Sequence, residues 1–256
     1  MPADGVWGHR KRAARAEHAR ALDGPPATFV AHPPAGRYTP AMVPGVRVVA
    51  EVVIVAVPIL VAVVFHEVAH GAVAYAFGDP TAARAGRLTL NPIPHIDPFG
   101  TVILPGLLYL FTHGAFLFGY ARPVPVDFGR LRHPRRDAVL VALAGPATNL
   151  VLATVSAFVL GLLPPPQAAS ASANLLHGVA LASLTINCVL AVFNLIPVPP
   201  LDGGRVLTAF LPTGAARALA RVETVGLLIV LLVVMNSNVI GRLVRPLMVF
   251  LLRMVG

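Results

Sequence analysis

Long apolar stretches, separated by short polar links that are rich in proline, fill the chain from residue 52 almost to its C-terminus. A helix rises about 1.5 Å per residue, so it needs about 20 apolar residues to cross the ~30 Å hydrocarbon core of a bilayer. Three stretches are long enough, at approximately 52–77, 138–163 and 175–196. The pattern therefore predicts an all-α polytopic membrane protein.

Two further apolar regions are less regular. Residues 99–118 contain Pro105, His113 and several glycines, so this region is compatible with either a full span or a re-entrant hairpin. Residues 222–254 hold two shorter apolar runs that are broken by "NSN" and by two arginines, which predicts a helical hairpin. Together with the three clear spans, these regions predict about four to six transmembrane helices.

The link after the first span is too polar and too rich in proline to cross a membrane. Gly78, Asp79 and Pro80 predict the end of the first helix. The fragment "RLTL" at 87–90 has the alternation of a short strand. We expect this link to form a loop that faces the functional site.

Composition supports a membrane location. Hydrophobic residues make up 56% of the 256 residues and charged residues 12%, which is about half the charged share of a typical soluble domain. This leaves too little polar surface to cover a water-facing domain of any size. The single cysteine, Cys188, lies in an apolar stretch, so a disulfide framework and a cysteine metal cluster are both excluded. Any metal must be held by His, Asp or Glu.

The formal charge of +9 does not indicate a nucleic-acid partner, because the basic residues form no continuous stripe with stacking aromatics. We interpret residues 1–40 as a disordered basic tail and residues 41–256 as one membrane-embedded domain. The link between the first two clear spans carries seven arginines, whereas residues 164–174 carry none, so we expect this link to lie in the cytoplasm. The seven are Arg84, Arg87, Arg122, Arg130, Arg132, Arg135 and Arg136. The basic tail favours the opposite orientation, so the sequence does not decide on which side of the membrane the tail lies.

Three ionisable residues, His66, Glu67 and His70, lie inside the first apolar stretch as "HEVAH". Positions i and i+4 share one face of a helix, so the two imidazoles can bind one ion while Glu67 reaches a molecule bound to that ion. Each such group costs roughly 2.5 kcal/mol or more at membrane depth unless it ligates or pairs. The alternative is a polar cluster whose hydrogen bonds are satisfied by neighbouring helices.

A catalytic zinc site usually takes three protein ligands and keeps a fourth position for water. The best candidate for the third ligand is Asp202 in "PVPPLDGGR", where prolines stop a span and two glycines free the backbone. The same letters also fit a capping turn before a helix that starts near Arg205.

Four segments in this order resemble the site-2 protease family of intramembrane zinc metalloproteases, in its minimal bacterial branch without PDZ or CBS domains. They are "HEVAH", "NPIPHIDPFG", "ALAGPATN" and "NLIPVPPLDGGR", and the similarity covers about residues 50–250. The resemblance implies that His66, His70 and Asp202 ligate one Zn²⁺ and that Glu67 is the general base and acid. It also implies a three-helix catalytic core that cleaves transmembrane segments of other proteins, in the bacterial plasma membrane.

Further residues carry weaker predictions. Asn149 in "GPATN" is a candidate to hydrogen-bond the substrate carbonyl or its oxyanion, and a helix-to-helix hydrogen bond is the alternative. His95 and Asp97 either orient a ligand or form a polar turn. His113 and His177 receive no role. Residues 86–90 are a candidate edge for pairing with an unwound substrate.

The leading interpretation is therefore an intramembrane zinc endopeptidase. The main alternative is a membrane metal binder or transporter without proteolytic activity, which would not need a base beside the ligands. Substrates would be chosen by the membrane part, by the basic link or by a separate adaptor, and a homo-oligomer is a further option.

Overall fold

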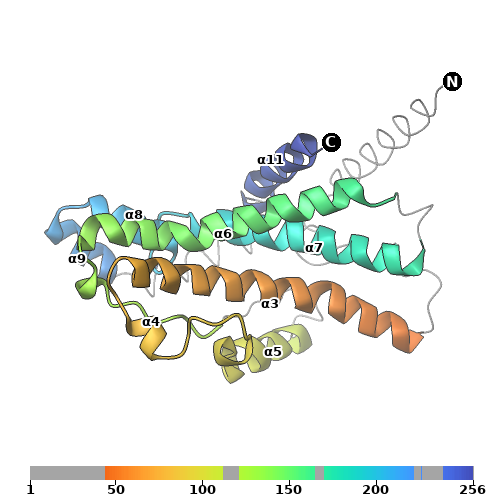
Figure 1. Cartoon of the computed structure of the whole chain (residues 1–256), viewed down its shortest axis with the longest axis horizontal. Coiled ribbons are helices and arrows are strands. Elements are labelled where there is room, and N and C mark those ends of the chain that lie inside the picture. The colour runs from red at the N-terminus through yellow and green to blue at the C-terminus, as the bar shows by residue number, and fades with distance from the viewer. Residues whose placement is uncertain (1–43, 112–120, 165–169, 222–225, 227–238, 256) are drawn as a thin grey trace.

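A computed structural model of the chain describes residues 44–111, 121–164, 170–221, 226 and 239–255. Every regular element in these ranges is helical (Figure 1). The predicted tail at 1–40, His113 and nearly all of the first run of the predicted C-terminal hairpin lie outside the described residues.

Three long helices form the centre of the molecule: α3 (Pro44–Ala76), α6 (Pro134–Leu162) and α7 (Ala171–Asn194). Each is long and apolar enough to cross a membrane, and each packs against the other two (Figure 1). The three predicted spans are therefore confirmed. α3 begins eight residues before the predicted start, because nothing in residues 44–51 stops a helix.

A fourth helix, α11 (Val239–Met254), packs against α7 and α6. Its buried face joins a core cluster in which Leu184 and Cys188 of α7 meet Val244 and Met248 of α11. Burial of this apolar contact area fixes α11 against the side of the bundle. The second run of the predicted C-terminal hairpin is thus helical.

The described part of the link between α3 and α6, residues 77–111 and 121–133, contains five elements: α4 (Thr81–Arg84), η2 (Ile93–His95), η3 (Pro98–Ile103), α5 (Leu104–Phe111) and η4 (Phe128–Arg130). η3 continues directly into α5, whose described part ends at Phe111, so the prediction of a full span or a re-entrant hairpin at 99–118 lies partly outside the described residues. The short strand considered at 87–90 is not formed, since no strand lies beside it in the described part of the chain.

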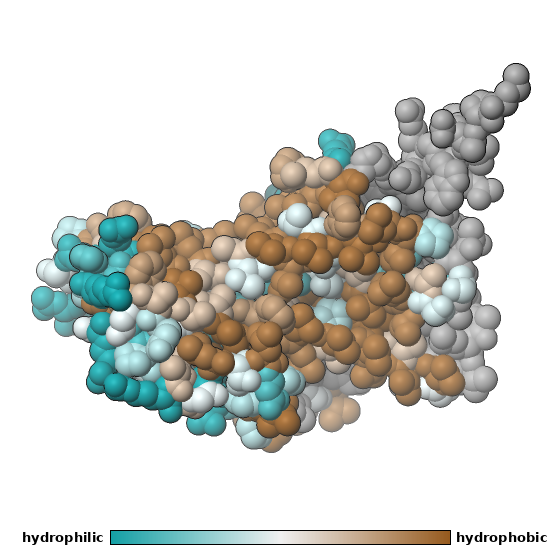
Figure 2. Space-filling view, in the orientation of Figure 1, coloured by the Kyte–Doolittle hydropathy of each residue, from teal (hydrophilic) through white to brown (hydrophobic). Residues whose placement is uncertain are grey.

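The surface also fits a bilayer. Apolar side chains cover the long helices, whereas hydrophilic residues gather at the end of the molecule that holds α4, α8 (Asp202–Phe210) and α9 (Thr213–Arg221) (Figure 2). Exposed apolar residues recur every three or four positions where α6 faces outward, as expected for a helix that contacts lipid. These residues are Leu140, Leu143, Ala147, Val151, Val155, Phe158 and Leu162.

Candidate metal centre

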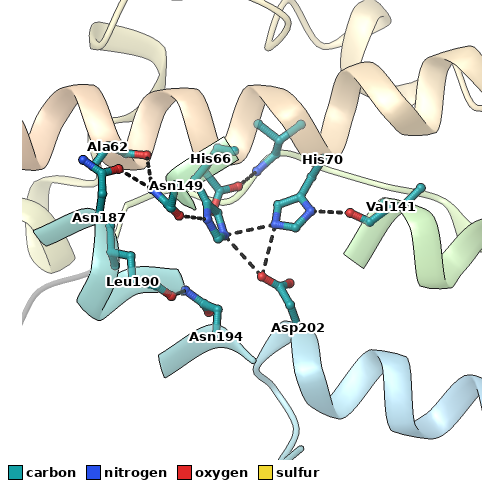
Figure 3. A network of polar contacts seen from close by, with 11 residues as sticks. Ala62, His66, His70, Val141, Asn149, Asn187, Leu190, Asn194 and Asp202 are labelled. Atoms are coloured by element: carbon teal, nitrogen blue, oxygen red, sulfur yellow. Dashed lines mark hydrogen bonds and ion pairs between the residues drawn. The ribbon is translucent and has the colours of Figure 1, made fainter. Parts of the chain in front are cut away.

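Three potential metal ligands meet inside the bundle. α3 supplies His66 and His70, and the first residue of α8 supplies Asp202 (Figure 3). The Nε2 atoms of His66 and His70 are 3.0 Å apart. Oδ2 of Asp202 lies 3.2 Å from Nε2 of His66 and 3.3 Å from Nε2 of His70. All three residues are buried, and no other group of three His, Cys, Asp or Glu residues converges in this way among the described residues.

Asp202 is a helical residue, so the capping interpretation of this position is wrong. Leu201 occupies the N-cap and no side chain caps α8, while the Asp202 carboxylate points at the imidazoles. The two glycines that follow allow the first turn of α8 to press against the preceding loop. A Cβ at Gly203 would lie 2.3 Å from the carbonyl oxygen of Leu195, and one at Gly204 would lie 2.3 Å from the nitrogen of Pro199.

Hydrogen bonds fix the tautomers of both histidines. Nδ1 of His66 lies 2.6 Å from Oδ1 of Asn149, and Nδ1 of His70 lies 2.7 Å from the carbonyl oxygen of Val141. A carbonyl oxygen only accepts, so each Nδ1 must carry the proton. In the neutral form of each ring, the Nε2 atom therefore presents a lone pair to the space shared with Asp202.

This donor set fits a zinc ion. The Asp202 Oδ2 atom is buried and has no hydrogen-bond partner, so three lone-pair atoms face one another with no proton between them. Such an arrangement is repulsive unless a cation lies among them. Ligand atoms about 2.0–2.2 Å from a tetrahedral zinc lie about 3.3 Å from each other, close to the separations observed here.

The charge of Asp202 also suits a cation ligand. Burial acts to raise the pKa of this carboxyl, whereas protonated imidazoles of His66 and His70 lower it below its usual range. When both Nε2 atoms are unprotonated, a bound cation would take the place of that positive charge and keep the carboxylate ionised.

The backbone of α6 forms one wall of the site. A Cβ added at Gly145 would lie 2.4 Å from Nε2 of His70 and 2.6 Å from Nε2 of His66. Both distances are too short for any side chain, so only glycine allows the imidazoles to pack against α6 here. The backbone of α6 at Gly145 therefore lies directly against the two histidine rings.

Asn149 takes part in helix-to-helix hydrogen bonds. It is fully buried, and its Nδ2 lies 2.8 Å from Oδ1 of Asn187 on α7 and 3.3 Å from the carbonyl oxygen of Ala62 on α3. Because Oδ1 of Asn149 accepts a hydrogen bond from His66, both the oxygen and the NH₂ group of this amide are bound by protein groups. Sequence reasoning missed Asn187, whose only signal is an amide side chain within an apolar span.

Glu67 is half-buried beside the cluster and has a fixed contact. Its Oε2 accepts a hydrogen bond of 2.7 Å from the backbone N–H of Val124. The Val124 and Leu88 side chains pack over Gly71, where a Cβ would lie 2.8 Å and 2.7 Å from them. The segments around 88 and 124 therefore lie on α3 next to Glu67.

Asp79, predicted only as part of a helix end, holds this region together. Its fully buried carboxylate accepts from the backbone N–H and the hydroxyl of Thr81, and from the backbone N–H of Asp127 at 2.7 Å. Burial acts to raise the pKa of Asp79, but the hydrogen bonds from Thr81 and Asp127 lower it overall. Gly78, with φ of +104°, supplies the left-handed residue that ends α3.

His95 and Asp97 lie in a polar turn outside the three-ligand cluster. His95 is buried and its Nε2 is 2.9 Å from the carbonyl oxygen of Thr89, so it braces the loop. The Asp97 side chain accepts from the backbone N–H of Gly100 at 2.7 Å and caps η3. His177 is buried in α7 and is not a member of the cluster.

Comparison with known proteins gives one consistent family. The model of peptidase family M50 matches residues 161–236. A protein named "Putative zinc metalloprotease YwhC" from Bacillus subtilis is 40% identical over 177 residues, which cover 68% of this chain and 77% of that protein. "Putative zinc metalloprotease Rip2" from Mycobacterium tuberculosis is 36% identical over 183 residues, covering 71% and 66%. "Putative zinc metalloprotease MJ0611" from Methanocaldococcus jannaschii is 34% identical over 146 residues, covering 56% and 63%. No solved structure matches the chain.

Proposed function

Because this chain belongs to peptidase family M50 and is a zinc metalloprotease, we propose that it hydrolyses peptide bonds within or near the transmembrane segments of other membrane proteins. One observation carries the proposal. The cluster of His66, His70 and Asp202 lies between helices of membrane-spanning length, with Glu67 beside it. A peptidase with its ligands at this depth meets substrate chains in the bilayer.

In this proposal His66, His70 and Asp202 hold one Zn²⁺ per chain. A bound zinc ion supplies Lewis acidity, which makes water a usable nucleophile near neutral pH. The chain holds the ligands ready, because the Nδ1 hydrogen bonds to Asn149 and Val141 fix both rings. The carboxylate of Asp202 supplies negative charge to balance the ion.

Glu67 is the proposed general base and acid. Its carboxylate removes a proton from the attacking water as the new carbon–oxygen bond forms, and it delivers that proton to the amine nitrogen as the peptide carbon–nitrogen bond breaks. The hydrogen bond from the Val124 N–H holds the carboxylate in place. Asn149 acts in this scheme as a positioning residue, since an additional contact to an oxyanion would require it to give up a hydrogen bond within the bundle.

The cut needs water and an unwound substrate. His70 lies six residues before the end of α3 at Ala76, toward the hydrophilic end of the molecule, so water has a short path to the site. A substrate helix must also break its own backbone hydrogen bonds. We propose that residues 86–90 supply replacement partners, and Leu90→Pro, at an exposed position, should reduce turnover while zinc content stays constant. Equal losses of turnover and of zinc content in Leu90→Pro would contradict the pairing of residues 86–90 with the substrate.

The arginine-rich end that surrounds α4 and the start of α6 faces the cytoplasm in this proposal. The host membrane is then the bacterial plasma membrane, with substrates released by cleavage as part of regulated intramembrane proteolysis. The basis is the charge asymmetry between the two ends, together with the bacterial relatives.

Glu67→Gln tests the function directly, because Gln keeps the shape of Glu67 and cannot accept the proton. Purified wild-type and variant proteins in lipid nanodiscs are compared for zinc content and for cleavage of a model transmembrane substrate. We expect the variant to retain zinc and to lose cleavage by 10²-fold or more, about the contribution of general acid–base catalysis. Asp202→Ala should lose zinc and cleavage together. A Glu67→Gln protein that cleaves at the wild-type rate would refute proteolysis and leave metal binding or transport as the function.

A further inference from the structure

A chain of buried amides connects α7, which supplies no metal ligand, to His66 on α3. Asn187 of α7 is 1% exposed, and its Oδ1 lies 2.8 Å from Nδ2 of Asn149 on α6 (Figure 3). Oδ1 of Asn149 then lies 2.6 Å from Nδ1 of His66. Three helices thus contribute one residue each to a continuous hydrogen-bonded path that ends at a proposed zinc ligand.

Backbone carbonyls fix the direction of this path. Nδ2 of Asn187 lies 2.8 Å from the carbonyl oxygen of Ser183, which only accepts, so Oδ1 of Asn187 must face Asn149. Asn149 therefore turns its Nδ2 toward Asn187 and toward the carbonyl oxygen of Ala62. Its Oδ1 is left to face His66, whose Nδ1 must donate.

The two histidines differ in how their tautomers are held. His70 donates to the carbonyl oxygen of Val141, a backbone group inside α6 that cannot turn over. His66 donates to a side-chain amide, which can rotate by half a turn and exchange its oxygen for its NH₂ group. A reversed Asn149 would place a donor at Nδ1 of His66 and move the proton to Nε2, where it would block metal binding.

We propose that Asn187 is a positioning residue that keeps Asn149 from reversing and so holds His66 in the metal-binding tautomer. The proposal rests on the proposed zinc centre. Without Asn187, the contact of 3.3 Å with the Ala62 carbonyl is the one remaining Nδ2 interaction that opposes reversal, and it is longer than the lost bond of 2.8 Å. Outer partners of metal ligands typically contribute 10- to 100-fold to metal affinity.

The test uses Asn187→Leu, which keeps the approximate volume and removes the acceptor, and Asn187→Ala, which relieves crowding if the Leu variant folds poorly. Asn187→Asp keeps an acceptor at the same place and serves as the conservative rescue. Thr185→Val is the matched control, because the Thr185 hydroxyl donates to the Leu181 carbonyl of its own helix. Full-length proteins in nanodiscs are titrated with Zn²⁺ in competition with a chelator, and zinc-free samples with ¹⁵N-labelled histidine are examined by NMR.

We expect the Leu and Ala variants to bind zinc 10- to 100-fold more weakly, while the Asp variant and the control stay within a few-fold of wild type. The ¹⁵N signals of His66, assigned by their loss in His66→Gln, should change from the Nδ1–H to the Nε2–H pattern in the Leu and Ala variants alone. Wild-type affinity with an unchanged pattern in Leu and Ala would overturn the role of Asn187. Equal weakening in Asp or in the control would overturn it too. Glu67→Gln tests the proposed function separately, so failure of one proposal is distinguishable from failure of the other.

Discussion

Three lone-pair atoms from His66, His70 and Asp202 meet in a buried space, and this determines the chemistry at the residue scale. Each of these groups alone would be costly inside an apolar bundle. When each neutral imidazole carries its proton on Nδ1, no proton lies between Nε2 of His66, Nε2 of His70 and Oδ2 of Asp202. One cation relieves the repulsion of all three. A polar cluster without a metal would leave Oδ2 of Asp202 without a hydrogen-bond donor while both rings are neutral.

Gly145→Ala should weaken zinc binding without changing any of the three proposed ligands. The new methyl group would lie 2.4 Å from Nε2 of His70, so one or both rings must move away from Asp202. We expect zinc affinity to fall by at least 10-fold, measured by chelator competition. Gly106→Ala on α5 is the control, since nothing lies within 4 Å of its Cβ position. Unchanged zinc affinity in Gly145→Ala would show that the rings do not pack against α6 as described.

The meeting of these three residues was only partly predictable: His66 and His70 have the i, i+4 spacing of one helix face, whereas the residues around Asp202 fitted a capping turn equally well and the family resemblance implied its place beside them. Asn187 was not predictable, since one amide in an apolar span has no partner at a characteristic spacing. Its partner Asn149 lies on another helix, and only the packing of α6 against α7 brings the two together. The same packing turned the predicted oxyanion residue toward His66.

At the scale of elements, the link between α3 and α6 is held by side chains in place of a strand. Asp79 joins the end of α3, the start of α4 and the segment that presents Val124 to Glu67. The alternation at 87–90 was misleading, because a strand needs a partner and Leu88 instead packs over Gly71. Sequence patterns report local preference, whereas this link takes its shape from contacts distant in the chain.

The stability of this link should depend on acid through Asp79. The folded state lowers the pKa of Asp79, so its contribution to stability is present above the unfolded pKa of about 3.9 and is lost as pH falls through the lower folded value. Melting temperatures in nanodiscs should therefore decrease below about pH 4 more steeply for wild type than for Asp79→Ala, which should already be less stable at pH 7. Parallel melting curves for the two proteins across this pH range would contradict the role given to Asp79.

At the scale of the whole molecule, α3, α6 and α7 are long and apolar enough to cross a membrane, and the link between α3 and α6 is rich in arginine whereas residues 164–174 contain none. Span length and arginine distribution predict that these two regions lie on opposite sides of the bilayer, and both are readable without knowing which helices touch. The sequence did not predict that α11 packs beside α7, because apolar composition alone does not choose a packing partner.

Labelling of engineered cysteines tests this topology. The one native cysteine, Cys188, is fully buried and provides a silent background. His133→Cys, just before α6, should react with a membrane-impermeant maleimide from the cytoplasmic side, and Ser172→Cys, at the start of α7, from the opposite side. Reaction of both cysteines from one side would contradict the three-span arrangement, and the reverse pattern would invert the orientation.

Zinc K-edge X-ray absorption of the purified wild-type protein, with zinc counted per chain, tests the central claim most directly. We predict one zinc per chain, a first shell of nitrogen and oxygen at about 2.0–2.2 Å, and outer scattering from two imidazoles that is lost in a His66→Ala/His70→Ala variant. Asp202→Ala should remove one oxygen ligand or the metal itself. An active protein with less than one-tenth of a zinc per chain, or a spectrum that these substitutions leave unchanged, would show that His66, His70 and Asp202 do not hold the ion.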